Sequence, residues 1–192
     1  MPRLFVALEI GATALDRVAD EQARLAETMR ESSLRWTKRD QLHITLVFIG
    51  EVSDDRAAQL VEIMRAPISQ PPFRFELGGV GAFPPRGAPR ALWIGVKSGA
   101  EQVIQLQSLI AGRLEDVGVE REHRPFSPHL TLARWRESRP SDRPGTSATS
   151  SPTIARVDVN TVTLFQSRVS SAGSTYTRLA ECPLRDRHES PS

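Results

Sequence analysis

A histidine followed two positions later by a threonine occurs twice in the chain, as HITL at 43–46 and as HLTL at 129–132. Both copies lie in apolar runs, so each is predicted to be a strand with side chains on alternating faces. His43 then shares a face with Thr45, and His129 with Thr131. Two imidazoles can take and give protons, and the threonine hydroxyls can hold phosphate oxygens. The repeat therefore predicts a two-histidine acid–base site.

Other chemistries fit the same residues less well. One such histidine could simply be a half-buried strand residue, but a copy in each half of the chain favours a paired site. A zinc site would need a third protein ligand, and Glu51, Glu120 and Glu122 are close to the motifs in sequence only. Cys182 is far from both motifs, and the chain has neither a G-x-S-x-G turn nor a phosphate-binding P-loop. We expect no metal and no cofactor.

Basic and aromatic residues near the second motif leave two interpretations open. Its arginines form either a solvated surface or a phosphate-binding rim; they are Arg121, Arg124, Arg134 and Arg136. Arg134 follows Thr131 by three positions, so strict alternation turns it to the opposite face unless the strand bulges. The three tryptophans could stack on bases, but each lies in a strand pattern, which favours core packing.

The composition is that of an ordinary globular protein, with 39% hydrophobic and 25% charged residues among 192. This length predicts one domain, or one domain built of two similar halves. No run approaches the roughly 18 apolar residues of a membrane span, and the apolar start of the chain fits a strand better than a targeting signal. The single cysteine fits a reducing cytoplasm. We expect a cytoplasmic monomer with no membrane contact and no obligate protein partner.

The order of elements predicts an α+β fold with mostly antiparallel strands. Besides the second motif strand, strands are expected at 4–10, 34–36, 43–49, 73–80, 91–96, 157–165 (with a slip in its alternation) and 176–184, with Gly50 ending the first motif strand. Helices are expected at about 13–30, from the Ser53 cap to Pro67, and at 101–117. Residues 137–153 are predicted to be a mobile surface loop, and 185–192 a frayed tail. We expect two pseudo-symmetric lobes with outer helices and an active-site cleft between them.

Several long phrases, in order, resemble the 2H phosphoesterase superfamily, and in particular its bacterial and archaeal RNA 2′,3′-cyclic phosphodiesterases, also called 2′-5′ RNA ligases. They are "RLFVALEI", "WTKRDQLHITLVFIGEV", "GVGAFPPRGAPRALWIGV", "HRPFSPHLTLAR" and "VTLFQSRVSSAGSTYTRLAECPL". The similarity covers nearly the whole chain and predicts a single bilobal domain over 1–184. Residues 137–153 depart from the family, which has a short helical segment there.

The resemblance implies metal-free hydrolysis of RNA 2′,3′-cyclic phosphate ends to 2′-phosphomonoesters, with ATP-independent 2′-5′ ligation as a reverse activity. It assigns His43 as the proton donor and His129 as the proton acceptor. Thr45 and Thr131 would hold the phosphate, and Arg134 would contact it. Two alternatives stay open: an RNA- or nucleotide-binding module without turnover, and a related enzyme acting on small cyclic nucleotides or 2′-5′ oligonucleotides.

Overall fold

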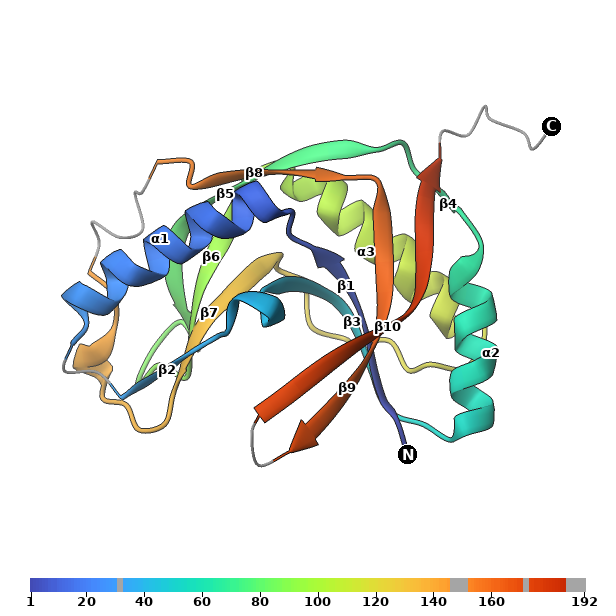
Figure 1. Ribbon diagram of the computed structural model, residues 1–192, viewed down its shortest axis with the longest axis horizontal. Helices are drawn as coiled ribbons and strands as arrows, with labels where there is room; N and C mark the ends of the chain where they lie inside the picture. Colours follow the sequence, from blue (N-terminus) through green and yellow to red (C-terminus); the bar gives the residue numbers. More distant parts are fainter. Residues whose placement is uncertain (31–32, 146–151, 171–172, 186–192) are drawn as a thin grey trace.

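Ten strands form two five-stranded sheets in the computed structural model, which describes residues 1–30, 33–145, 152–170 and 173–185 (Figure 1). The first sheet has the order β3-β1-β9-β10-β4, with β1 (Arg3–Glu9), β3 (His43–Glu51), β4 (Ile68–Ser69), β9 (Thr161–Ser170) and β10 (Gly173–Arg185). The second has the order β2-β7-β6-β5-β8, with β2 (Leu34–Trp36), β5 (Phe73–Phe83), β6 (Ala91–Ser98), β7 (His129–Trp135) and β8 (Ala155–Val159). All pairs are antiparallel except the short β4–β10 pair. The predicted α+β class, with one motif strand in each sheet, is confirmed.

Three α-helices lie outside the sheets, as predicted: α1 (Ala12–Thr28), α2 (Asp54–Arg65) and α3 (Ala100–Glu115). The Ser53 side chain caps α2 by accepting a hydrogen bond from the backbone N–H of Arg56, which satisfies one of the free donors of the first turn. The helices contact different strands: α1 packs on β8, α2 on β10, and α3 on both β3 and β5. Within the described part of the chain, no helix has the length and apolar character needed to cross a membrane.

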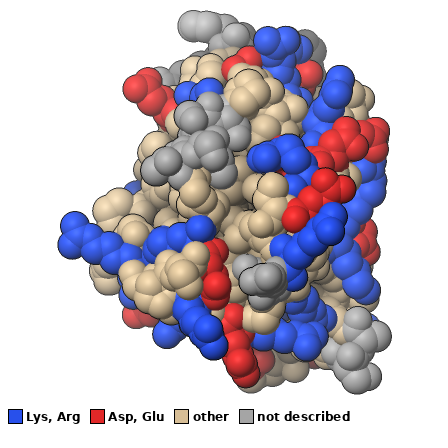
Figure 2. All heavy atoms as spheres, turned by 90° about the vertical axis from the view of Figure 1, so that its left-hand side faces the viewer, with Lys and Arg blue, Asp and Glu red and all other residues tan. Residues whose placement is uncertain are grey.

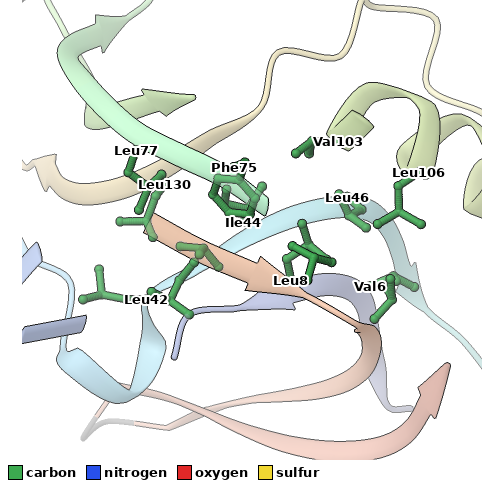
Figure 3. Packing of buried hydrophobic residues seen from close by; sticks show 14 of the residues in the cluster. Val6, Leu8, Leu42, Ile44, Leu46, Phe75, Leu77, Val103, Leu106 and Leu130 are labelled. Carbon is green, nitrogen blue, oxygen red and sulfur yellow. The ribbon is translucent and has the colours of Figure 1, made fainter. Parts of the chain in front are cut away.

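The larger of two hydrophobic clusters among the described residues joins the two sheets. Val6 and Ile44 come from the first sheet and Phe75 and Leu130 from the second, and all four are completely or almost completely buried in one cluster (Figure 3). The buried undersides of the two motif strands belong to this cluster, and β3 contacts β7 directly. Each motif strand is thus held from below by the same core, and the two strands are fixed relative to each other.

One predicted strand, 157–165, is in fact two strands in different sheets. Its first half is β8, paired with β5, and its second half lies in β9, paired with β1 and β10. Val157 and Val159 are buried, and so are Val162 and Leu164. The break in alternation at Asn160 is the point where the chain crosses from one sheet to the other, which explains why both halves have an apolar side.

Smaller predictions about strand ends and loops also need correction. β3 continues through Gly50, which has a φ of +86°, and ends at Glu51. The loop expected over 137–153 contains a short 3-10 helix, η2 (Pro140–Asp142), in which Asp142 accepts a hydrogen bond from the backbone N–H of Arg139. Arg143 then donates to the carbonyls of Pro84 and Gly87. Local hydrogen bonds therefore order the start of this segment, while 146–151 and most of the predicted tail lie outside the described residues.

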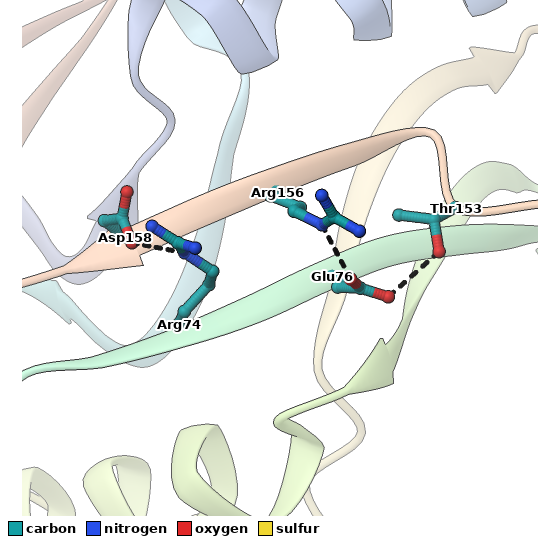
Figure 4. A network of polar contacts seen from close by, with 5 residues as sticks. All are labelled: Arg74, Glu76, Thr153, Arg156 and Asp158. Carbon is teal, nitrogen blue, oxygen red and sulfur yellow. Dashed lines mark hydrogen bonds and ion pairs between the residues drawn. The ribbon is translucent and has the colours of Figure 1, made fainter.

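Ion pairs on the outer face align β8 with β5 at the edge of the second sheet (Figure 4). Arg74 pairs with Asp158 at 2.6 Å, and Arg156 pairs with Glu76 at 2.8 Å. Such exposed pairs contribute little stability each. Their value here is to match opposite charges across the strands in a single register.

Candidate active site

The first motif strand exposes the predicted side chains on one face. His43 and Thr45 are half-buried, while Leu42, Ile44 and Leu46 are buried in the core on the other side. His43 lies opposite Glu9 and Thr45 opposite Ala7 on the neighbouring strand β1. The alternation predicted from the sequence is therefore present, and the core fixes which way the imidazole points.

The second motif strand repeats this arrangement. His129 and Thr131 are half-buried on the open face of β7, and Leu130 and Leu132 are completely buried beneath them. We call the two surfaces that carry His43 with Thr45 and His129 with Thr131 the motif faces.

A β-bulge lies at the fourth residue of each motif. In the β6–β7 pairing Trp93 lies opposite Thr131 but Leu92 lies opposite Ala133, so Leu132 is an extra residue. Leu46 is skipped in the same way between β1 and β3. A bulge shifts all following side chains to the other face. Arg134 is consequently exposed on the same face of β7 as His129. Strict alternation would have turned it to the opposite face, so the bulge is what makes a phosphate contact possible.

The bulge of β7 is held by a side chain that sequence reasoning missed. Gln22, on α1, donates from its amide nitrogen to the carbonyls of Leu132 and Thr37, each at 3.0 Å. The backbone N–H of Thr37 also donates to the Leu132 carbonyl. The carbonyl at the bulge therefore accepts two hydrogen bonds. Gln22 is 110 residues away from Leu132 in sequence, so no local pattern could have indicated the contact.

Both imidazoles are oriented by the same backbone hydrogen bond. Nδ1 of His43 lies 2.7 Å from the carbonyl of Gln41, and Nδ1 of His129 lies 2.8 Å from the carbonyl of Ser127. A carbonyl oxygen can only accept, so each Nδ1 carries the proton. The Nε2 atoms are then the ones that exchange protons with a substrate. Nε2 of His43 lies 3.0 Å from the hydroxyl of Thr45.

Aromatic rings surround each histidine. Of these residues, the sequence singled out Trp93 alone, as one of three tryptophans that could stack on bases. His43 is 5.0 Å from the ring of Phe5 and 5.3 Å from that of Tyr176. His129 is 5.0 Å from Phe83 and 6.3 Å from Trp93. The rings come from strands β1, β10, β5 and β6, so only the sheet pairing brings them to the motifs. The period-2 alternation of side chains in β1 and β6 was the one signal in the sequence that could have indicated these rings.

The aromatic surroundings lower the basicity of both histidines. Burial lowers the pKa of His43 below 6.5, although the hydrogen bond with Gln41 opposes the effect. Burial also lowers the pKa of His129; the hydrogen bond with Ser127 opposes this, and the positive charge of Arg134 lowers the pKa further. Both effects disfavour the imidazolium form. Burial therefore favours the neutral imidazole at both positions.

The charge of Arg134, on the second motif face, reaches Tyr176 beside the first. Burial raises the pKa of the Tyr176 hydroxyl, and the charge of Arg134 partly offsets it. Arg134 thus acts electrostatically on His129 of its own sheet and on Tyr176 of the other sheet, where Tyr176 packs against His43. The side chain of Gln41 also donates a hydrogen bond to the carbonyl of Ser174 at the start of β10. This bond connects the residues just before β3 to the β9–β10 hairpin. The site is formed by both halves of the chain.

The two halves differ at the fifth position after the histidine. Arg134 occupies it in the second copy and Phe48 in the first, and Phe48 is a large hydrophobic residue with 59% of its surface exposed. The ring of Phe48 lies 6.0 Å from that of Phe5. One motif face therefore offers a cation, and the other an exposed aromatic surface.

The remaining candidates of the sequence analysis lie elsewhere or have other roles. Cys182 is completely buried and burial raises the pKa of its thiol, which makes it a poor nucleophile. Arg121 pairs with Glu115, His123 is exposed, and His188 lies outside the described residues. Among the described residues, no three His, Cys, Asp or Glu side chains are grouped as metal ligands.

A separate hollow of about 560 Å³ lies at the other end of the first sheet. Its lining mixes Arg3 and Arg168 with Glu51 and Asp54 and includes none of the motif residues. It is not part of this site.

Comparison with known sequences identifies related proteins over most of the chain. The 2'-5' RNA ligase superfamily model matches residues 17–170. An RNA 2',3'-cyclic phosphodiesterase of Archaeoglobus fulgidus is 32% identical over 174 residues, which cover 91% of this chain and 96% of the relative. One of Aeropyrum pernix is 34% identical over 163 residues, covering 83% and 92%.

Solved structures agree with these sequence relatives. TT0787 of Thermus thermophilus superposes with a TM-score of 0.78 at 25% identity, covering 97% of this chain and all of that one. Escherichia coli LigT in complex with 3'-AMP gives a TM-score of 0.77 at 26% identity, with coverage of 97% and 100%. The similarity extends over both sheets and therefore over both halves of the site.

Proposed function

The chain belongs to the 2'-5' RNA ligase superfamily, and from that premise we propose that it hydrolyses RNA 2′,3′-cyclic phosphate ends to 2′-phosphomonoesters by acid–base catalysis with His43 and His129. The observation that carries the proposal is the repeated geometry of the two imidazoles. In each histidine, Nδ1 donates its proton to the carbonyl of the residue two positions earlier. Nε2 is therefore the nitrogen that exchanges protons with the substrate.

His129 is the proton acceptor in this mechanism. Its Nε2 makes no hydrogen bond to any described residue, and its lowered pKa keeps it neutral and able to accept a proton. It removes a proton from water as the water oxygen attacks phosphorus. Arg134, on the same face, stabilises the negative charge that develops on the phosphate oxygens.

His43 is the proton donor. The bond between phosphorus and the ribose 3′ oxygen breaks, and Nε2 of His43 protonates the departing oxygen. The free protein disfavours a charged His43, because burial lowers its pKa. A bound phosphate diester carries a negative charge, and a nearby opposite charge favours the imidazolium. Substrate binding therefore supplies the protonation state that the reaction needs.

The threonines hold the phosphate between the two histidines. Thr45 is already 3.0 Å from Nε2 of His43, so an oxygen bound by its hydroxyl also lies beside the acid. Thr131 is the corresponding residue of the second motif, two positions after His129 on the same face of β7. Because the hydroxyls are uncharged, they can donate hydrogen bonds to the non-bridging oxygens without an electrostatic shift in the pKa of either imidazole.

A nucleotide substrate fits the surroundings of the site. The exposed ring of Phe48 offers a surface on which a base can stack, and Arg134 offers a charged donor for a phosphate. Related proteins bear the name RNA 2',3'-cyclic phosphodiesterase, and E. coli LigT has been crystallised with 3'-AMP. The reverse reaction, joining a cyclic phosphate to a 5′-hydroxyl without ATP, uses the same groups and is proposed as a side activity.

The test is turnover of a short RNA ending in a 2′,3′-cyclic phosphate, measured in EDTA with the His43→Ala and His129→Ala variants. Each substitution should reduce kcat by about 10²- to 10⁴-fold, the usual contribution of general acid–base catalysis. Unchanged activity in both variants would contradict the proposal. Loss of wild-type activity in EDTA, with recovery on adding a divalent ion, would contradict its metal-free character.

Two other functions make different predictions in the same assay. A binding module would retain cyclic-phosphate ends without releasing product. A related enzyme would act faster on small cyclic nucleotides or 2′-5′-linked oligonucleotides than on the RNA end, so these substrates belong in the same experiment.

We also propose that the protein acts in the cytoplasm as a monomer, with RNA as its partner. The support is the single unpaired, buried Cys182 and a site that residues of one chain complete. Size-exclusion chromatography with light scattering tests the monomer.

A further inference from the structure

A second arginine stands directly beside Arg134. In the β2–β7 pairing, Arg35 lies opposite Arg134, with Leu34 opposite Trp135 and Trp36 opposite Ala133. Leu34, Trp36 and Trp135 pack against the core. Arg35 and Arg134 are both exposed and, as directly paired residues, they lie on the same face. The bulge that turns Arg134 onto the motif face therefore places it next to Arg35.

Nothing in the described part of the chain neutralises this pair. No hydrogen bond or ion pair joins the Arg35 or Arg134 side chain to a described carboxylate, whereas seven arginines elsewhere have such partners. Like charges directly opposite each other on neighbouring strands are destabilising. An anion bound between or beside the two guanidinium groups would remove this repulsion.

Arg35 also reaches the hairpin of the other sheet. Its Nη2 would lie 3.5 Å from a Cβ atom built on Gly173, at the start of β10. That strand carries Tyr176, which packs on His43 and senses the charge of Arg134. Arg35 therefore borders the space between the two sheets. It lies beside Arg134, on the edge strand β2. Figure 2, which turns the left-hand side of Figure 1 to the viewer, shows basic side chains on both sides of a tan strip, with acidic side chains among them.

On the basis of the proposed function, we propose that Arg35 binds the phosphodiester that links the terminal nucleotide to the rest of the RNA. Arg134 serves the cyclic phosphate at the histidines, and its neighbour on β2 serves the next phosphate along the strand. Arg35 then acts as a specificity residue: it favours the end of an RNA chain over a free nucleoside 2′,3′-cyclic phosphate, which lacks the second phosphate.

The experiment compares two substrates, a short oligoribonucleotide ending in a 2′,3′-cyclic phosphate and the matching nucleoside 2′,3′-cyclic phosphate. Arg35→Ala should lower kcat/KM on the oligonucleotide about tenfold or more, as expected for a lost charge-assisted hydrogen bond, and leave the mononucleotide within about twofold. Arg134→Ala should lower both. Arg35→Lys should recover part of the loss, because it restores the charge but not the forked donor.

Salt dependence gives a second readout. The slope of log(kcat/KM) for the oligonucleotide against log[salt] should become shallower by about 0.7 in Arg35→Ala, the contribution of one phosphate contact on a single strand. Arg65→Ala is the matched control, because Arg65 is an exposed arginine at the end of α2 and pairs, among the described residues, with Glu62 alone. It should change neither the slope nor the substrate ratio.

The possible results separate this inference from the proposed function. Equal losses on both substrates, or no loss on either, would overturn the assignment of Arg35. The absence of turnover of both substrates by the unsubstituted protein would instead contradict the proposed function. Thermal melting of each variant shows whether a loss reflects unfolding, and a folded Arg35→Lys variant keeps the test valid if Arg35→Ala does not fold.

Discussion

His43 and His129 have the same backbone hydrogen bond but different neighbours, and the difference suits two roles. Nε2 of His43 faces the Thr45 hydroxyl, while Nε2 of His129 has no partner among the described residues and lies near a positive charge. A base benefits from a cation that keeps it neutral, and an acid gains its proton when an anionic substrate binds. The two histidines therefore have the same backbone geometry but different chemical surroundings.

The lowered pKa values of both histidines predict an acidic optimum for kcat/KM. In the free protein His43 must be protonated and His129 neutral, and burial moves both titrations below 6.5. Because the pKa of His43 lies below 6.5, the reference value of histidine, its protonated fraction already falls as the pH approaches 6.5, and kcat/KM should fall with it. Bound substrate raises the pKa of His43, so kcat should persist to higher pH.

A pH series of initial rates on the cyclic-phosphate RNA measures both parameters. Histidine titrations followed by NMR in the unliganded protein, with His43→Ala and His129→Ala for assignment, check the pKa directions directly. A kcat/KM profile that still rises above pH 8 would contradict this account.

At the scale of elements, the bulge of β7 is the feature that determines where Arg134 points. The extra residue Leu132 is stabilised by hydrogen bonds to its carbonyl from the Thr37 backbone and from Gln22. Gln22→Ala removes the side-chain donor. We expect the bulge to loosen and kcat/KM to fall several-fold, because a small misplacement of a positioned group is costly in catalysis.

The readout that separates positioning from simple destabilisation is a double-mutant cycle. If Gln22 acts through Arg134, the Gln22→Ala/Arg134→Ala variant should be no less active than Arg134→Ala alone. Gln59→Ala on α2 is the matched control, since Gln59 is an exposed helical glutamine whose side chain accepts a hydrogen bond from Arg56 on the same helix. Additive losses would show that Gln22 does not work through Arg134.

The junction between β6 and α3 depends on a glycine that no other residue can replace easily. Gly99 has a φ of +79°, and a Cβ atom there would lie 2.7 Å from the carbonyl of Arg74. Gly99→Ala should therefore lower the free energy of unfolding by about 1–3 kcal/mol. Gly112, within α3, has open space around it, so Gly112→Ala should raise that free energy by up to about 1 kcal/mol. Urea denaturation of both variants gives the comparison; equal effects would contradict it.

Local patterns predicted much of the site, and long-range contacts account for the rest. Period-2 alternation placed His43 and Thr45 correctly, because the apolar underside leaves only one way to bury β3. Family resemblance gave Arg134 as a phosphate contact, but alternation could not place it on the motif face, because that depends on a bulge held by a side chain of α1. The same holds for Tyr176, which reaches His43 only through the pairing of β1 with β9 and β9 with β10. The split of 157–165 at Asn160 is likewise a choice between sheets that alternation alone does not encode.

At the scale of the whole molecule, the site requires that the two sheets keep a fixed relation. His43 and His129 lie on different sheets, and their strands share one buried cluster that includes Ile44 and Leu130. α3 packs on both β3 and β5 and so contacts both sheets. This continuity predicts one cooperative folding unit over residues 1–184 instead of two independent lobes.

The chain carries a natural probe for each sheet, which makes that prediction testable. The three tryptophans lie in strands β2, β6 and β7 of the second sheet, and the single cysteine, completely buried, lies in β10 of the first. In urea, tryptophan fluorescence and the reactivity of Cys182 with a thiol reagent should report the same midpoint of unfolding.

Leu130→Ala, a truncation in the second sheet, should lower the free energy of unfolding by about 2–5 kcal/mol. Because the core is shared, it should shift the exposure of Cys182 by the same amount, whereas Val169→Ala, at a position with 72% of its surface exposed, should shift neither probe. A Leu130→Ala variant that moves only the fluorescence transition would mean that the two halves fold separately and that the spacing of the histidines is set after folding, by docking of the lobes.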